Sequence, residues 1–173
     1  MKCANDTFDC ISADENQTES TPDVNTGVTQ LLELTSFKGT KSLSSQDVSK
    51  RVEKLGGMVQ CISSREHIIF CIDTLRVNAS DAIELIADSV ISPRVLPEDV
   101  EEAKHVIAMQ NQFLAPDVAS RDAWNIAGYK NSPTGNFHLC PEHRVQHLSL
   151  DMLENFRKDK IFASNVIVAG TGI

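Results

Sequence analysis

Potential metal-binding side chains gather near residue 140, and they are the first candidates for chemistry in this sequence. His143 and His147 are four residues apart, so on a helix they would share one face. Cys140 or Glu142 could supply a third ligand, and a zinc ion held in this way would activate a bound water. The alternative is a short solvated helix that binds no metal. No spacing in the chain indicates a Ser-His-Asp or Cys-His nucleophile arrangement.

A second candidate is the segment from Gly27 to Thr40, which reads GVTQLLELTSFKGT. It resembles the metal-binding helix of the pitrilysin/insulinase-type zinc peptidases, where the pattern is G-x-x-H-x-x-E-H-x-x-F-x-G-T. In that pattern two histidines bind zinc and the glutamate acts as general base on the zinc-bound water. Gln30 and Leu34 stand at the two histidine positions here, and Glu33 remains. The resemblance therefore implies a helix that does not bind zinc.

The third ligand position leads to the same expectation. In the family this ligand is a glutamate on a later helix, and the matching stretch 108–112 contains Asn111 and no carboxylate. We therefore predict no catalytic, cofactor-binding or metal-binding residue in this chain, with Gln30, Glu33, Leu34 and Asn111 as degenerate positions. Glu33 is expected to hydrogen-bond a neighbouring backbone group or an arginine.

The resemblance extends over roughly residues 27–173. Its further motifs are the glycine pair at 56–57 with Arg65-Glu66, the prolines at 93 and 97, the loop 135–142 and the segment 166–172. The resemblance makes the surroundings of Cys140 a surface connection, so we expect no metal at His143 and His147. It implies part of the first half of a pitrilysin-type peptidase domain.

The periodicity of apolar residues predicts the elements that carry these motifs. Helices are expected at 27–37, 44–54, 78–90, 97–113, 117–129 and 149–160, and strands at 58–63, 68–74 and 165–170. The first two strands would form a hairpin, within which Arg65 and Glu66 would pair. Phe113 and Trp124 are predicted to be core residues, and the inner face of the helix at 78–90 is predicted to consist of Ile83, Ile86, Ala87 and Val90. The fold class is α+β, with an antiparallel or mixed sheet flanked by helices.

Charge divides the chain into an acidic segment, 1–26, which has a possible short strand at 8–13, and a partial pitrilysin/insulinase-like N-terminal domain, 27–173. Residues 1–25 hold six acids against Lys2, a net of −5 out of −8 for the whole chain. The remainder is nearly balanced in charge, which disfavours nucleic acid as a partner.

No apolar run approaches the roughly 20 residues of a membrane span. Five cysteines without a C-x-x-C pair indicate a reducing compartment.

Two non-catalytic branches of the family fit these residues. The loop 135–142 resembles the alpha subunit of the mitochondrial processing peptidase, which supports presequence cleavage by a zinc-bearing beta subunit. Residues 32–36 resemble the second core subunit of the respiratory cytochrome bc1 complex. A third possibility is an independent metallohydrolase with a displaced site.

The resemblance also implies partners and a location. We expect no activity from the chain by itself, and zinc only in a homologous beta-type partner of a heterodimer; the alternative partners are respiratory complex subunits. Basic presequence peptides are possible ligands, which the acidic segment would attract. The location would be mitochondrial, in the matrix or at the inner membrane.

Overall fold

The computed structural model describes residues 26–129 and 132–172; the strand predicted at 8–13 lies outside them. The described helices are α1 (Val28–Thr35), α2 (Ser45–Leu55), α3 (Ala79–Ile91), α4 (Pro97–Gln112), α5 (Pro116–Gly128), α6 (Glu142–Val145) and α7 (Leu150–Lys160). The strands are β1 (Met58–Ser63) and β2 (Ile68–Asp73), and short 3-10 turns occur at Arg76–Asn78, Pro133–Gly135 and Ala163–Asn165. The predicted α+β class is confirmed.

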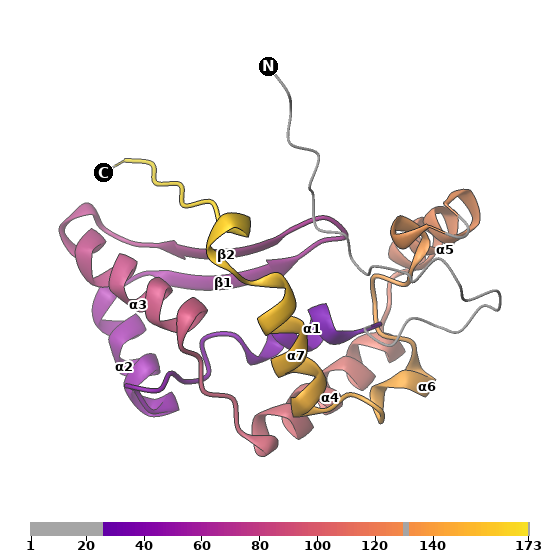
Figure 1. Cartoon of the computed structure of the whole chain (residues 1–173), viewed down its shortest axis with the longest axis horizontal. Coiled ribbons are helices and arrows are strands. Elements are labelled where there is room, and N and C mark those ends of the chain that lie inside the picture. Colours follow the sequence, from indigo (N-terminus) through magenta and orange to yellow (C-terminus); the bar gives the residue numbers. More distant parts are fainter. Residues whose placement is uncertain (1–25, 130–131, 173) are drawn as a thin grey trace.

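The two strands form an antiparallel hairpin, as predicted. The register pairs Met58 with Asp73 and Ser63 with Ile68. In Figure 1 the hairpin lies across the upper part of the molecule, α2 and α3 lie at one end, and α5 stands off at the other. Helix α1 contacts β1, α4 and α7, so it is the central element of the fold.

Two apolar clusters hold these elements together. The larger joins α1, α4 and α7 with the segment that surrounds α6, and it contains Val28, Leu31, Leu32, Val100, Ala103, Ile107, Cys140, Val145, Leu148, Leu153 and Phe156. The smaller packs α2 against α3 and consists of Val48, Leu55, Ala82 and Leu85. Within the part of the chain that the structure describes, none of the helices combines the length and the apolar character that crossing a bilayer requires.

Local sequence signals place the helix ends where they were expected. Ser44 caps α2 by accepting a hydrogen bond from the backbone N–H of Asp47, and Gly56 ends that helix with a φ of 63°. Pro97 occupies the first position of α4, where its missing N–H costs nothing. Ser149 caps α7 through the N–H of Met152. These ends depend on contacts within one turn, which is why sequence alone predicts them.

The predicted inner face of α3 is wrong. The residues expected to point inward were Ile83, Ile86, Ala87 and Val90, but the buried residues of α3 are Ala82, Leu85 and Ser89. Ile83 is 54% exposed. The helix carries apolar residues on most of its circumference, so periodicity could not select one face. Contacts with β2 and α2 select it instead.

Phe113 and Trp124 are not core residues, contrary to the prediction. Phe113 is 80% exposed and Trp124 is 79% exposed. Helix α5 has no buried residue, and its principal contacts are with the turn Pro133–Gly135. Apolar spacing predicts which residues share a helix face, but a face is buried only where another element covers it.

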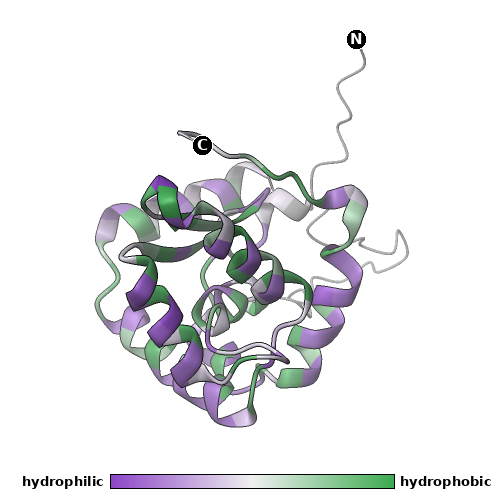
Figure 2. Ribbon diagram, turned by 90° about the vertical axis from the view of Figure 1, so that its left-hand side faces the viewer, coloured by the Kyte–Doolittle hydropathy of each residue, from purple (hydrophilic) through white to green (hydrophobic). Residues whose placement is uncertain are grey.

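The strand predicted at 165–170 is also wrong for this structure. The chain leaves the 3-10 turn Ala163–Asn165 and continues to residue 172 without forming a strand. Ile167 is 94% exposed and Val168 is 86% exposed. Figure 2 shows this hydrophobic segment as a green stretch that runs toward the C-terminus. A β-branched run favours extended backbone, but a strand exists only where a neighbour supplies hydrogen bonds.

Candidate functional site

Helix α1 carries three of the four degenerate positions, and the fold fixes each of them differently. The helix begins after Gly27, whose φ is 87°, and ends at Thr35. Gln30 and Leu34 are one turn apart and therefore share a face, whereas Glu33 lies on the adjacent face. Because α1 contacts β1, α4 and α7, its polar side chains must find partners inside the protein.

Gln30 is a buried amide with both ends occupied. Only 6% of its surface is exposed. Its Oε1 accepts a hydrogen bond of 2.9 Å from the backbone N–H of Cys140, and its Nε2 donates to Oε1 of Gln110 at 2.7 Å. A residue on α1 thus binds α4 on one side and a backbone group 110 residues away on the other.

Asn111 on α4 meets the same peptide segment from another direction. Its Nδ2 donates to the carbonyl oxygen of Cys140 at 2.9 Å. The N–H and the C=O of Cys140 are therefore both held by amide side chains, one from each helix. Cys140 is 1% exposed, and burial raises the pKa of its thiol to about 11. The structure brings two degenerate positions together at one residue.

Glu33 points to the hairpin instead. Its Oε2 accepts hydrogen bonds from the backbone N–H of Ser63 at 3.1 Å and from the Ser63 hydroxyl at 2.6 Å. This confirms the expectation that Glu33 bonds a neighbouring backbone group. Leu34 packs against the larger apolar cluster as an ordinary hydrocarbon side chain. Neither side chain supplies the hydrogen bonds to the Cys140 backbone, which come from Gln30 and Asn111.

We expect Glu33→Gln to lower the free energy of unfolding by about 1 kcal/mol, because the two hydrogen bonds lose their charged acceptor. Urea denaturation measures the change. The matched control is Glu53→Gln on the exposed side of α2, which should stay within about 0.5 kcal/mol of the unsubstituted chain. Equal effects of the two substitutions would contradict a structural role for Glu33.

A zinc ion does not fit these side chains. Zinc in proteins is bound by thiolate, imidazole or carboxylate, and the three ligand positions offer an amide, a hydrocarbon and an amide. Both amides are engaged with Cys140. Among the described residues no cluster of three or more His, Cys, Asp or Glu side chains could hold a metal ion.

The candidate metal ligands near residue 140, which were not expected to bind a metal, do not come together in the structure. Helix α6 ends at Val145, so it does not carry both His143 and His147. Both histidines are exposed, whereas the Cys140 thiol is buried in the larger cluster. The thiol and the imidazoles therefore do not converge on one point.

A polar site that the sequence does not predict joins the hairpin to α5. Arg65 forms an ion pair with Asp122, whose side chain is 14% exposed, and donates to the carbonyl oxygen of Thr134 at 2.7 Å and to that of Asn136. Burial, followed by the charge of Arg65, lowers the pKa of His138. Arg65 was expected to act locally within the hairpin, but these contacts span more than fifty residues. No short-range pattern encodes them.

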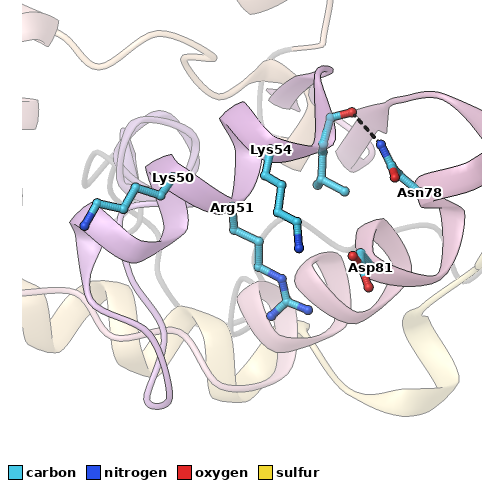
Figure 3. A pocket seen from close by; sticks show the side chains of 6 residues that line it. Lys50, Arg51, Lys54, Asn78 and Asp81 are labelled. Atoms are coloured by element: carbon cyan, nitrogen blue, oxygen red, sulfur yellow. Dashed lines mark hydrogen bonds between the residues drawn. The ribbon is translucent and has the colours of Figure 1, made fainter.

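A surface hollow of about 370 Å³ lies between α2 and α3, away from the residues described above. Its polar lining comes from Lys50, Arg51 and Lys54 on α2 and from Asn78 and Asp81 at the start of α3. In Figure 3 Arg51 and Lys54 point toward α3, while Lys50 points away. Arg51 is paired with Glu84 at 2.6 Å. The lining thus has three cationic side chains and one carboxylate, that of Asp81, and Glu84 neutralises only Arg51.

Comparison with known proteins places these observations in a family. The model of the insulinase family, peptidase family M16, matches residues 19–142. Several curated relatives are alpha subunits of mitochondrial-processing peptidase. The one from Solanum tuberosum is 31% identical over 149 residues, which is 85% of this chain and 29% of the relative.

Another kind of relative and a solved structure extend the comparison. The ubiquinol-cytochrome-c reductase complex core protein I of Euglena gracilis is 24% identical, over 86% of this chain and 31% of its own length. A crystal structure of a protease from Helicobacter pylori has the same fold, with a TM-score of 0.70 and 20% identity, over 80% of this chain and 34% of that one. This chain spans 26% to 31% of the length of such curated relatives.

Proposed function

This chain belongs to the insulinase family of peptidases, family M16, and on that premise we propose that it is a non-catalytic, alpha-type subunit of a mitochondrial processing peptidase. The observation that carries the proposal is the state of the three ligand positions. The side-chain amides of Gln30 and Asn111 are hydrogen-bonded to the backbone of Cys140, and Leu34 packs against an apolar cluster. The similarity to alpha subunits supports the choice of branch.

In this proposal the chain performs no catalytic step and contributes only to the shape of the assembled peptidase. A homologous beta-type subunit would carry the zinc ion and the general base, and the two subunits would enclose basic presequence peptides between them. The engagement of Glu33 with Ser63 supports this division, because a carboxylate that accepts two internal hydrogen bonds is not aimed at a water. The relatives are mitochondrial proteins, and we propose the matrix or the inner membrane as the location.

A second candidate is a structural core subunit of the respiratory cytochrome bc1 complex. The observation that favours it is the similarity to core protein I of Euglena gracilis over most of this chain. The loss of zinc-ligand side chains suits this role as well, because a scaffold subunit needs no metal. The two candidates differ in their partners and not in the chemistry of this chain.

We expect the purified chain to leave a basic presequence peptide uncut, because no described side chains offer a zinc-ligand set. Adding a zinc-bearing beta-type subunit should allow cleavage, and a chelator should abolish it. The measurement is the rate of product formation by mass spectrometry, with the beta-type subunit alone as control. Cleavage by this chain alone that a chelator stops would contradict the proposal.

Affinity purification of the tagged chain separates the two branches. Recovery of a beta-type processing subunit supports the proposed function. Recovery of cytochrome b and cytochrome c1 in its place would assign the chain to the bc1 complex.

A further inference from the structure

The peptide segment at Cys140 is held on both sides by side chains from two different helices. Gln30 on α1 accepts from its N–H, and Asn111 on α4 donates to its C=O, each at 2.9 Å. Most buried backbone groups are paired within a helix or a sheet. Cys140 belongs to neither, so these amides supply what a neighbouring strand would otherwise give.

The fit around Cys140 is close as well as polar. Gly27 at the start of α1 packs directly on this residue, since a Cβ added to Gly27 would lie 2.5 Å from the Cys140 Sγ. The Cys140 thiol donates a hydrogen bond of 3.6 Å to the carbonyl oxygen of Pro141. Two helices and one glycine thus define the place of a single peptide unit.

We propose that Gln30 and Asn111 form a peptide clamp, a pair of positioning residues that keep the segment 139–142 closed against α1 and α4. In this chain the two ligand positions have become a binding site for its own backbone, so that point is closed to a metal ion and to a substrate. The inference rests on the proposed non-catalytic function and deepens it. The clamp also fixes the segment that leads from the Arg65 contacts at Asn136 to Val145 in the core.

The direction of each hydrogen bond gives the clamp a chemical signature. Gln30 acts on Cys140 as an acceptor, whereas Asn111 acts as a donor. A carboxylate at position 30 keeps its acceptor, and the amide of Gln110 can rotate to donate to it. A carboxylate at position 111 has no proton to donate and would repel the Cys140 carbonyl. The same change therefore has opposite consequences at the two positions.

The test is alkylation of the whole native chain with iodoacetamide, with each cysteine quantified by mass spectrometry. Cys140 is 1% exposed, and Cys61 provides an internal reference because burial raises the pKa of both thiols to about 11. A change in the ratio of the two rates between a variant and the unsubstituted chain then reports opening at Cys140. We expect Gln30→Met and Asn111→Asp to accelerate the labelling of Cys140 about tenfold or more, with Cys61 unchanged.

Two variants serve as matched controls. Gln30→Glu should open Cys140 less than Gln30→Met does, because it keeps the acceptor, and the carboxyl at this buried position can take up a proton and donate to Gln110 in place of the amide. Gln112→Met on the exposed side of α4 should have no effect.

Three results would overturn the clamp. They are full protection of Cys140 in both Gln30→Met and Asn111→Asp, opening by Gln30→Glu as large as by Gln30→Met, or parallel acceleration of Cys61, which would mean global unfolding. Failure of the proposed function is a separate result. It would show as chelator-sensitive cleavage by this chain alone, whatever the labelling pattern.

Discussion

Gly27→Ala is expected to lower the free energy of unfolding by about 2–4 kcal/mol. Two costs add at this position. Gly27 has a φ of +87°, a left-handed conformation that costs a residue with a Cβ about 1 kcal/mol. The new methyl would also lie 2.5 Å from the Cys140 Sγ and 2.6 Å from its Cβ, so the packed segment must shift, at about 1–3 kcal/mol. Urea denaturation of the two chains measures the difference.

Gly56→Ala is the matched control, because it isolates the backbone cost. Gly56 also has a positive φ, of 63°, but nothing lies within 4 Å of an added Cβ. Its substitution should therefore cost only about 1 kcal/mol. Adding Cys140→Gly to Gly27→Ala removes the Sγ and the Cβ, the two nearest of the atoms that the methyl meets, so the pair should cost less than the sum of the two changes. Equal costs for Gly27→Ala and Gly56→Ala would contradict the contact with Cys140.

The second large effect is expected for Arg65→Met, which should lower the free energy of unfolding by about 2–3 kcal/mol. The substitution keeps much of the side-chain volume but leaves the Asp122 carboxylate, 14% exposed, without its cation. The carbonyl oxygens of Thr134 and Asn136 lose a charged donor at the same time. The measurement is again urea denaturation, combined with limited proteolysis of the region around α5.

Arg121→Met is the control for this second effect. Arg121 lies on the same helix as Asp122, but its side chain is 77% exposed and its ion pair with Asp117 is 3.9 Å long. Exposed pairs of this kind contribute little, so the change should stay within about 0.5 kcal/mol. Helix α5 should become cleavable in Arg65→Met and not in Arg121→Met. Similar protection of α5 in both variants would mean that Arg65 does not hold this helix.

The local elements of this fold could be predicted because their causes are local. The hairpin follows from two β-branched runs around a polar turn, and the observed strands Met58–Ser63 and Ile68–Asp73 match the prediction within one residue. Ser44, Gly56 and Ser149 act on backbone groups within one turn of their own helices. Such interactions depend on spacing along the chain, which the sequence states directly.

Burial was predicted less well, because it depends on what an element packs against. Trp124 lies on an apolar helix face that no other described element buries, and the apolar residues at 166–168 lack a neighbouring strand. Ile83 lies on an apolar side of α3, but the side that packs toward β2 is the one that carries Leu85. In each case the residue is apolar, as burial requires, but no neighbouring element in the described part of the chain covers it.

For the candidate site, the sequence alone determined which side chains stand at the ligand positions: Gln30, Leu34 and Asn111, with Glu33 beside them. That was enough to predict that they make no zinc-ligand set, because ligand chemistry is a property of the side chain itself. Only the tertiary structure decided what these residues do instead. The amides of Gln30 and Asn111 meet at Cys140, and Glu33 meets Ser63. Those partners lie about thirty or more residues away along the chain, and only the packing of α1 against α4 and β1 brings them within hydrogen-bonding distance.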